Sequence, residues 1–354
     1  MNPSTTDQTP PTFSVVIANY NGLAFLKTCF DSLNKSTYPS IEIIMVDNGS
    51  TDESVSFVEE NYPSVQIVKS PINLSYSGGN NLGMRQARGK YIVLLNNDTE
   101  VTPGWLEPLL EELESDKQIA ACQPKILNMR DRKAFEYAGA AGGFMDRLAY
   151  PFLRGRIFDT VEEDHHQYQT PVDLFWTSGA AMAIRKDVLD EAGFLDEDFV
   201  LHMEEIDLCW RLHLLGYRMR ARPDAVIYHY GGGTLGREKT AKMYYNHRNS
   251  VFMLLKNYTF RSIVKVLPKR LLLDLALIIK SLLTLDLKRA TAVAGAYLWL
   301  LFHVNLINIK HREVQRLRRV GDKEVDKFLY PRSVALAYYI RRKKTFSEIW
   351  DQRA

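Results

Sequence analysis

The amino-acid sequence predicts an α/β fold in which a mostly parallel sheet is covered by helices on both faces, with a helical region after it. Short apolar, β-branched runs alternate with amphipathic stretches from Phe13 to about Pro124, which is a βαβ rhythm. The runs are continuous and rich in β-branched residues, as in strands that are buried on both faces. After about Met243, long apolar stretches mixed with basic residues replace this alternation.

The first part of the chain divides into four strands and three helices. The apolar runs FSVVIA, IEIIMV, VQIVK and YIVLL predict strands over 13–18, 41–46, 65–69 and 91–95. The stretches between them predict helices over 22–34, 51–61 and 79–88. Ligands of such sheets bind at the carboxyl ends of the strands. The residues that follow the runs, 19–22, 47–52 and 96–98, are therefore the first candidates for a site.

Three regions are expected along the chain. Residues 1–12 are polar and rich in Pro and Thr, which indicates a frayed tail. Residues 13–242 form one catalytic unit, whose less regular second half contains a predicted helix near 205–215 closed by Gly216. Residues 243–354 form the helical region.

The helical region has features of a membrane-associated segment. Its longest uncharged stretch, 290–309, is 20 residues long, the minimum needed to cross about 30 Å of hydrocarbon. The stretch contains His303, Asn305 and Asn308, and charged residues interrupt the sequence before it. We therefore expect helices that lie in the membrane interface rather than span it. The alternative is an ordinary helical domain packed on the sheet or on a second subunit.

Composition excludes several classes of protein. The 354 residues carry 45 Lys and Arg against 42 Asp and Glu, and a net charge of +3 gives no reason to expect nucleic acid as a partner. Cys29, Cys122 and Cys209 lie far apart without CxxC spacing, which argues against a zinc site or a disulfide framework and favours a reducing cytosolic setting. The N-terminus does not have the pattern of a signal peptide, so we expect the catalytic part in the cytoplasm.

Polar residues follow the predicted strands. Asp47 stands in a VDNGSTD turn, where an acid either completes turn and cap hydrogen bonds or accepts bonds from a nucleotide's base or ribose. Asp98 follows the fourth strand and is either a cap or a ligand of a phosphate-bound divalent cation. The glycines of 77–81 would offer backbone N–H groups to an anion if they open a helix. GxGxxG and GxxxxGK[ST] are both missing, which disfavours nicotinamide and P-loop chemistry.

Two later segments carry further titratable groups. Glu204, Glu205 and Asp207 stand at the start of a predicted helix, where the helix dipole favours acids and where a general base is also well placed. His229 precedes the glycine run 231–233, which we expect to belong to a moving loop. A histidine in this position is either structural or functional.

Seven blocks in fixed order strongly resemble the family 2 inverting glycosyltransferases, especially the bacterial rhamnosyltransferase-like branch. The resemblance covers about residues 13–255, and no single block would suffice for it. The blocks are VVIANYNG, VDNGSTD, SGGNN, LLNNDTE, WTSGAAMAIRKDVLDEAGFLDEDF, HMEEIDLCWRLHLLGYR and YHYGGG.

The resemblance implies a GT-A fold, which is Rossmann-like, a nucleotide-sugar donor and a Mg²⁺ or Mn²⁺ ion. Asp47 corresponds to the family's base- or ribose-binding aspartate, and Asp98 to the last acid of its metal-binding DxD element, which reads Asn96-Asn97-Asp98 here. His229 matches a histidine that helps bind metal or diphosphate. The full set expected to bind the nucleotide sugar is Asn19, Asn21, Asp47, Gly79, Asn80, Asn97 and Asp98.

The resemblance also assigns a catalytic base and the residues that would line the acceptor side. The second acid of the family's acidic pair, its catalytic base, falls on Glu205, and Asp207 is the reserve candidate. The acceptor side would be lined by Trp176, Thr177, Ser178, Gly179 and Glu204.

The function expected from the resemblance is inverting transfer of a sugar, from dTDP-rhamnose or a UDP-sugar, to a saccharide or polyprenyl-diphosphate-linked acceptor in cell-surface polysaccharide synthesis. The enzyme would then lie on the cytoplasmic face of the membrane, where its basic and apolar helical region concentrates it with its substrate. The sequence does not indicate whether the protein forms oligomers. The competing interpretations are a catalytically silent nucleotide-sugar-binding scaffold subunit and a nucleotidyltransferase.

Overall fold

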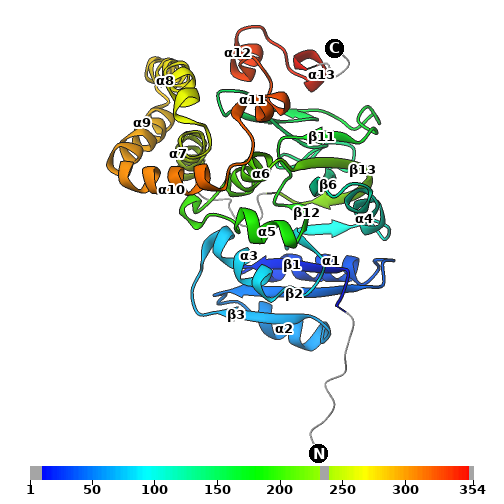
Figure 1. The fold of residues 1–354 in the computed structure, drawn as a ribbon. Helices are drawn as coiled ribbons and strands as arrows, with labels where there is room; N and C mark the ends of the chain where they lie inside the picture. The colour runs from blue at the N-terminus through cyan, green and yellow to red at the C-terminus, as the bar shows by residue number, and fades with distance from the viewer. Residues whose placement is uncertain (1–9, 232–238, 351–354) are drawn as a thin grey trace, which may run out of the picture.

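The computed structural model describes residues 10–231 and 239–350 (Figure 1). The described chain forms a nine-stranded central sheet in the order β11-β13-β6-β12-β4-β1-β2-β3, with β5 paired to β13. The sheet is parallel from β4 to β3 and again from β6 to β13, and the antiparallel strand β12 joins the two parts. The predicted α/β fold with a mostly parallel sheet is confirmed.

The strands of this sheet include the four expected from the apolar runs, within one or two residues. Their bounds are β1 (Phe13–Asn19), β2 (Ile41–Asn48), β3 (Gln66–Ser70), β4 (Tyr91–Leu95), β5 (Thr99–Val101), β6 (Ile119–Asn128), β11 (Val172–Leu174), β12 (Ala181–Arg185) and β13 (Arg218–His229).

Helices cover both faces of the sheet, as the continuous apolar runs predicted. Alternate residues of β1 belong to two separate cores: Phe13, Val15 and Ile17 pack toward α1, α2 and α4, while Val16 packs toward α3 and α6. The bounds of these helices and of α5 are α1 (Leu23–Leu33), α2 (Ser54–Asn61), α3 (Ser75–Gln86), α4 (Leu106–Ser115), α5 (Asp187–Ala192) and α6 (Glu204–Leu214), with a 3₁₀ turn η1 (Glu197–Phe199).

A second, four-stranded antiparallel sheet lies beyond the central one and was not predicted. Its strands are β7 (Gly143–Met145), β8 (Pro151–Leu153), β9 (Arg156–Ile157) and β10 (Thr160–Val161). Phe144 and Phe152 of this sheet stack with Phe346 and Trp350 near the C-terminus. The last described residues are thereby anchored on the catalytic part of the chain.

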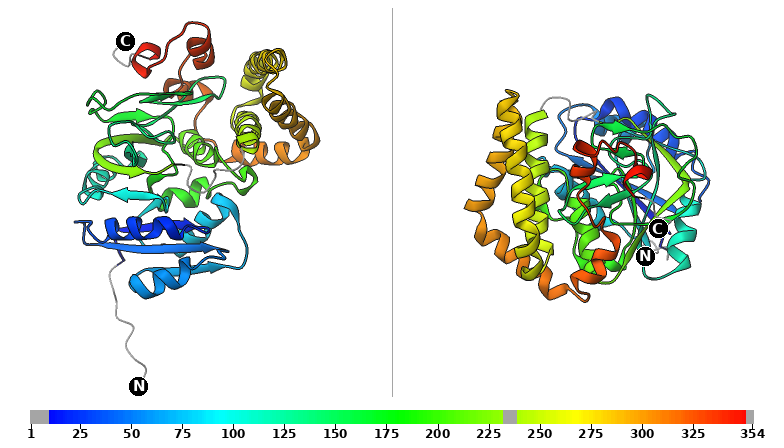
Figure 2. Two further views of the ribbon diagram at one scale, coloured as in Figure 1. Left: turned by 180° about the vertical axis from the view of Figure 1, so that it is seen from behind. Right: turned by 90° about the horizontal axis from the view of Figure 1, so that it is seen from above.

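The C-terminal region is helical, and four of its helices stand beside the sheet as a separate layer (Figures 1 and 2). These are α7 (Lys239–Asn257), α8 (Phe260–Leu283), α9 (Leu287–Phe302) and α10 (Val304–Leu317). The remaining elements are α11 (Asp322–Val325), η2 (Asp326–Phe328), α12 (Val334–Tyr339) and α13 (Phe346–Ile349). The expected boundary between residues 242 and 243 lies inside α7. Of the tail expected over 1–12, residues 1–9 lie outside the described residues, and Thr12 donates its backbone N–H to Ser40.

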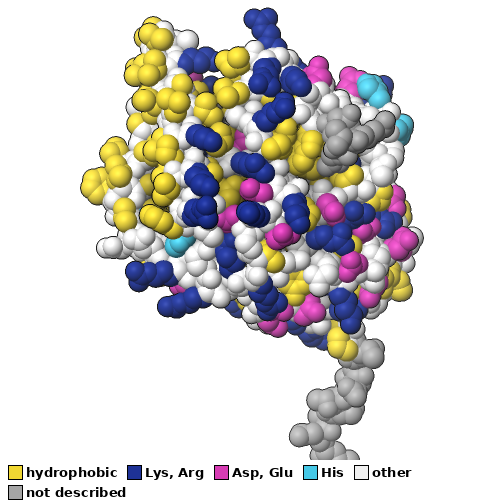
Figure 3. Space-filling view, turned by 45° about the horizontal axis from the view of Figure 1, so that its top comes forward, with side chains coloured by type: hydrophobic (Ala, Val, Ile, Leu, Met, Phe, Trp, Pro, Cys, Tyr) yellow, Lys and Arg dark blue, Asp and Glu magenta, His cyan; other side chains and the backbone are white. Residues whose placement is uncertain are grey.

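Exposed apolar side chains gather on this helical layer. Among the described residues, fifteen of the twenty-two large hydrophobic side chains that are exposed lie between Phe260 and Ile309, and three more lie at α12. Figure 3 shows them as a yellow area at the left, with a column of Lys and Arg side chains beside it. Among the described helices, none alone has the length and hydropathy to cross a membrane, although α9 and α10 satisfy the criteria jointly across a 75° bend. The uncharged stretch 290–309 is therefore broken at His303.

Candidate active site

The candidate site lies where the carboxyl ends of neighbouring strands meet. Because β1 and β2 are parallel and in register, Asn19 stands directly beside Asp47. β4 leads into Asn96–Asp98, and β13 pairs with β5 so that His229 lies opposite Thr99. Sheet topology thus brings residues together that are far apart in the chain, such as Asp98 and His229, which are 131 positions apart.

Hydrogen bonds connect the strand ends on the side expected to bind the nucleotide. Asn97 donates its side-chain amide to Asn19 Oδ1 at 2.7 Å. The buried Asp47 accepts the backbone N–H of Ser50 at 3.1 Å through Oδ1, which is the turn contact of the simpler interpretation. A role of Asp47 in nucleotide binding therefore stays a prediction.

Asn21 and Asn80, which were predicted to bind the nucleotide sugar, use their side chains within the fold. Asn21 Oδ1 accepts the backbone N–H groups of Thr51 and Asp52 at 2.7 and 3.3 Å, which fixes the turn after β2. Asn80 donates its amide to the carbonyl of Tyr76, one turn earlier in α3, at 2.9 Å. These contacts are those of structural residues.

The prediction that the backbone N–H groups of the glycine pair 78–79 open a helix and bind an anion is wrong. Helix α3 begins at Ser75, four residues earlier than predicted, so the N–H groups of both glycines lie inside the helix. Gly79 is needed for packing instead, because a Cβ there would lie 2.9 Å from Asn48 Nδ2 on β2. The glycines therefore allow α3 to lie close to the sheet.

Asp98 and His229 are in direct contact at the sheet edge. His229 Nε2 lies 2.9 Å from Asp98 Oδ1, and Nδ1 lies 3.3 Å from Glu136 Oε2. Burial alone would lower the pKa of His229, but the hydrogen bonds and charges of the two carboxylates outweigh it and raise that pKa to about 10. Burial likewise opposes the charged form of Asp98, yet the contact with His229 leaves the pKa of Asp98 below its usual value. The cluster is an imidazolium between two carboxylates.

The donor set at this point fits a divalent cation that is shared with a diphosphate. Within residues 10–231 and 239–350, no three His, Cys, Asp or Glu side chains converge as a complete metal cage. A Mg²⁺ or Mn²⁺ ion that carries substrate phosphates commonly takes only one or two protein carboxylates. Asp98 provides one, and His229 can join it after losing its proton.

Glu205 and Glu204 begin helix α6 on the other side of the site. Each has one carboxylate oxygen, Oε2, that is buried and forms no hydrogen bond with any residue that the structure describes. Burial raises the pKa of Glu205 to about 7, although backbone N–H groups, including that of Gly179, act in the opposite direction. Burial and the adjacent Glu205 raise the pKa of Glu204 further. An unpaired carboxyl with a pKa near neutrality is well suited to general base catalysis.

The loop before α6 is strained and held in place by α7. Val200, His202 and Met203 all have positive φ angles, of 63°, 66° and 75°, which are unfavourable for residues with a side chain. The buried Asn249 of α7 shares its amide hydrogens among the carbonyls of Phe199, Leu201 and His202, at 2.8, 2.8 and 2.7 Å. The helical region therefore fixes the conformation from which Glu205 projects.

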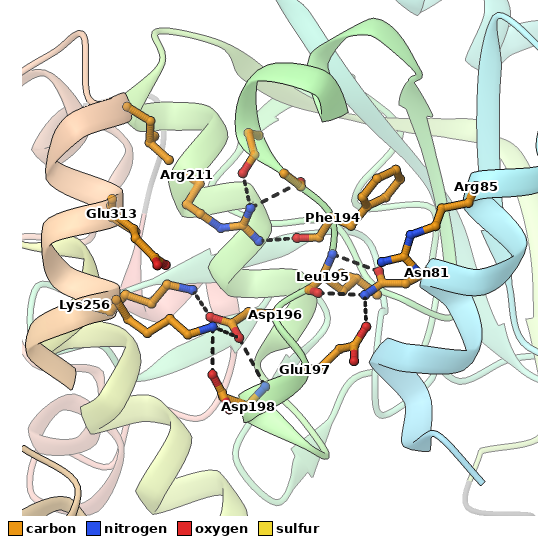
Figure 4. A pocket seen from close by; sticks show the side chains of 15 residues that line it. Asn81, Arg85, Phe194, Leu195, Asp196, Glu197, Asp198, Arg211, Lys256 and Glu313 are labelled. Atoms are coloured by element: carbon orange, nitrogen blue, oxygen red, sulfur yellow. Dashed lines mark hydrogen bonds and ion pairs between the residues drawn. The ribbon is translucent and has the colours of Figure 1, made fainter. Parts of the chain in front are cut away.

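Asp207 does not reach the site, which corrects its assignment as the reserve base. It is fully buried and accepts hydrogen bonds from Arg211, Lys256 and Asn257 at 2.9, 2.8 and 2.9 Å. Figure 4 shows Lys256 and Arg211 in the adjoining polar pocket of about 480 Å³, where Lys256 also binds Asp196. These ion pairs attach α7 to α6 and to the loop before η1, so Asp207 is a structural residue.

The segment expected on the acceptor side passes between the two halves of the site. The backbone of Gly179 accepts the hydroxyl of Tyr76 at 2.7 Å, and Ala180 accepts the N–H of Asn96 at 3.0 Å. Trp176 donates its indole N–H to Phe144 at 2.8 Å and turns its ring toward a groove. Ser178 and the buried Thr177 make only internal contacts among the described residues. Trp176 is therefore the residue of this segment best placed to line an acceptor, whereas Gly179 is buried and does not line the groove.

The groove extends from Glu205 to the helical layer and has a volume of about 710 Å³. Trp176, Met203 and Ile206 line it beside Glu205, and residues of α8 and α12 line its far end. Sequence analysis did not identify Glu136, Arg156, Lys242 or Asn249, although each contacts the cluster, the groove or the loop before α6. They are single polar residues outside any motif, and only the tertiary fold assembles them.

Known proteins resemble this chain in sequence. Residues 14–192 match the family model for glycosyl transferase family 2. An N-acetylglucosaminyl-diphospho-decaprenol L-rhamnosyltransferase of Mycobacterium tuberculosis is 23% identical over 257 residues, which is 68% of this chain and 83% of that protein. N-acetylgalactosaminyltransferase 6 of Drosophila melanogaster is 27% identical over 252 residues, which is 68% of this chain but 37% of that protein.

Solved structures resemble it in fold. GalNAc-T7, solved with UDP, GalNAc and Mn²⁺, superposes with a TM-score of 0.54 at 19% identity, over 70% of this chain and 48% of its own. The mannosyltransferase PcManGT of Pyrobaculum calidifontis, solved with GDP-Man and Mn²⁺, has a TM-score of 0.51 at 16% identity and covers 95% of this chain and 89% of its own. These similarities confirm the predicted GT-A fold.

Proposed function

The chain belongs to glycosyltransferase family 2, and from this we propose that it moves one sugar, with inversion, from a nucleotide-diphosphate donor to a hydroxyl of a lipid-linked saccharide. One observation carries the proposal. Glu205 presents a buried, unpaired carboxylate oxygen and lines a groove that extends to the helical layer. An unpaired base of this kind has no purpose in a silent scaffold, so it favours an enzyme.

The proposed reaction is a single displacement. Glu205 takes the proton of the acceptor hydroxyl while the hydroxyl oxygen attacks the anomeric carbon of the donor. The bond from that carbon to the diphosphate breaks at the same time, and the nucleoside diphosphate leaves with the electron pair. Because the pKa of Glu205 is about 7, a large share of the carboxyl is already ionised at neutral pH.

On the donor side, Asp47, Asn19 and Asn97 would hold the nucleotide, with Asp98 and His229 at the diphosphate. When bound there, a Mg²⁺ or Mn²⁺ ion supplies Lewis-acid stabilisation of the charge on the leaving diphosphate. The name of the M. tuberculosis relative supports a rhamnosyl donor, and a UDP-sugar is the second donor to test. Structural relatives were solved with UDP or GDP-Man and with Mn²⁺, which supports the choice of cofactor.

The acceptor and the location follow from the helical region. The M. tuberculosis relative is named for a decaprenol-diphosphate-linked acceptor, and the present chain exposes apolar side chains beside basic ones on α8 and α9. Apolar burial combined with attraction to anionic lipid holds a protein at a membrane surface. We infer that the enzyme works on the cytoplasmic face of the membrane.

Transfer assays with the purified chain test this proposal. Nucleotide sugars are incubated with Mg²⁺ or Mn²⁺ and a synthetic lipid-diphosphate saccharide, and the products are identified by mass spectrometry. We expect one donor, with dTDP-rhamnose first, to give a product one sugar heavier. Metal-dependent donor hydrolysis without an acceptor would still support an enzyme, whereas nucleotide-sugar binding without any turnover would support the scaffold.

A further inference from the structure

The groove is lined by apolar and basic groups. Trp176, Met203 and Ile206 line it beside Glu205, and at the helical layer most of its lining is apolar, with Lys280 and Arg289 beside the apolar side chains. The apolar end consists of Leu273, Ala276 and Leu277 of α8 together with Leu336, Tyr339 and Ile340 at α12. Leu336, Tyr339 and Ile340 are also among the exposed hydrophobic side chains, so the apolar end is continuous with the exposed apolar area of the helical layer. A long hydrocarbon chain in that layer would thus have a direct path toward the base.

Arg156 and Lys242 also line the groove. Arg156 lies over the ring of Tyr137 with its guanidinium carbon 3.1 Å from the ring centroid, and Lys242 Nζ lies 4.7 Å from the same centroid. Across residues 10–231 and 239–350, no carboxylate oxygen comes within 4.0 Å of either charged group, although Glu136 and Asp159 lie at longer range. The guanidinium of Arg156 also donates to the backbone carbonyls of Phe158 and Tyr137. Partial burial and the charge of Arg156 both lower the pKa of Lys242. An anion between these cations would relieve their repulsion and their loss of solvent.

We propose that this groove binds the isoprenoid-diphosphate part of the acceptor, with the diphosphate on Arg156 and Lys242 and the isoprenoid chain between α8 and α12. The first saccharide unit then extends from the diphosphate to Glu205. The inference rests on the proposed transfer reaction, and it adds a lipid subsite built from both the catalytic part and the helical layer.

The combination of groups in the groove favours this ligand over a membrane phospholipid. The groove contains a base, two cations without a carboxylate partner within 4.0 Å among the described residues, and apolar side chains, and a polyprenyl-diphosphate saccharide has a reacting hydroxyl, an anionic linker and a hydrocarbon chain to match these three kinds of group. A phospholipid matches only the last two kinds. Its binding with equal strength is therefore an outcome that would overturn the assignment.

Binding of farnesyl diphosphate to the full chain, measured by calorimetry without donor or metal, tests the subsite. We expect it to bind at least tenfold more tightly than farnesol or inorganic diphosphate, because only the whole probe reaches both the apolar end and the cations. Equal affinity for all three probes would contradict the proposal. Displacement of the probe by short-chain phosphatidylglycerol at a similar concentration would show a general phospholipid site instead.

Matched variants locate the subsite. Lys242→Ala removes a side chain that makes no hydrogen bond with other described residues, so it leaves the fold intact and should weaken farnesyl diphosphate binding about tenfold or more. Leu277→Asp should weaken it similarly, while Leu275→Asp on the same helix, which lies outside the groove, should not. Equal effects of both aspartates would indicate non-specific adhesion to α8.

Glu205-dependent donor hydrolysis, measured on the same preparations, separates failure of the subsite from failure of the proposed function. Hydrolysis without farnesyl diphosphate binding would overturn the lipid subsite and leave the glycosyltransferase proposal standing. If the chain neither binds farnesyl diphosphate nor hydrolyses the donor, the lipid subsite and the glycosyltransferase proposal are both overturned.

Discussion

Replacing Glu205 with Gln is the most informative perturbation, because it keeps the shape of the side chain and removes its basicity. The loss of a general base costs on the order of 10²- to 10⁴-fold in turnover. Donor binding should stay nearly unchanged, since Glu205 begins α6 and the nucleotide residues lie at the ends of β1 and β2. Single-turnover transfer of a radiolabelled sugar measures the chemical step, and nucleotide affinity is measured separately by calorimetry. Glu204→Gln, in the adjacent and more deeply buried residue outside the groove, is the control and should be milder.

The pH dependence gives a second, independent readout. With a pKa of about 7 the base is mostly protonated at pH 6, so turnover of the natural chain should fall about tenfold for each unit below pH 7. This folded-state pKa lies above the usual value of 4.5, so the native state holds the proton more tightly than the unfolded state. The contribution of Glu205 therefore lowers the free energy of unfolding as pH rises from about 4.5 to 7, by up to about 3 kcal/mol. Glu205→Gln should remove that part of the pH dependence.

Helix capping alone predicts a different pattern. A carboxylate that only stabilises the first turn of α6 contributes about 0.3 to 1 kcal/mol and has no effect on turnover per folded molecule. Undiminished turnover in Glu205→Gln, together with a lower melting temperature, would refute the assignment of the base.

Four further predictions follow from the site and the helical layer. Asp98→Asn should abolish metal-dependent turnover with the fold intact, and full activity in Mg²⁺ would exclude Asp98 as the ligand. Asp47→Ala should weaken UDP or dTDP binding by the ~1.5 to 3 kcal/mol of a charge-assisted hydrogen bond, and unchanged calorimetric affinity would leave the residue a turn former. Asp207→Asn should destabilise the protein by about 3 to 5 kcal/mol in urea, because Arg211 and Lys256 lose a buried partner, while turnover per folded molecule stays within a few-fold. The double variant L301D/F302D should shift the protein from vesicles of phosphatidylglycerol to the supernatant in flotation assays, and undiminished flotation would argue against this face as the membrane contact.

The central sheet could be predicted because buried parallel strands are marked locally by continuous β-branched runs. YIVLL predicts β4 to the residue, and the acids after such runs identify the sheet edge. The small sheet β7–β10 could not be found in this way, since strands of two or three residues have no periodicity to read. The start of α3 was misplaced because a glycine pair resembles a helix start, whereas here close packing against β2 requires it.

Local sequence signals identify the strand-end and helix-start residues of the candidate site, whose roles stay predictions. They do not identify the residues that join it through long-range contacts. Asp98 and Glu205 follow local signals, a strand end and an acidic helix start. Glu136 meets His229 from an irregular segment, and Asn249 reaches the loop before α6 from about 50 residues further along the chain. Asp207 and Glu205 are both acids in the first turn of α6, so the sequence does not distinguish them. Only the tertiary contact with Lys256 shows that Asp207 faces away from the site. Of the glycine run after His229, residues 232 and 233 lie outside the described residues, and the expectation of a moving loop stays a prediction.

The anomeric configuration of the product tests the central claim most directly. Transfer by the purified chain is followed by proton NMR, which distinguishes the two anomers of the transferred sugar. A single displacement assisted by Glu205 predicts a configuration opposite to that of the donor, and formation of this product should be lost in Glu205→Gln. A product with retained configuration, or inverted product formed at an equal rate by Glu205→Gln, would contradict the account.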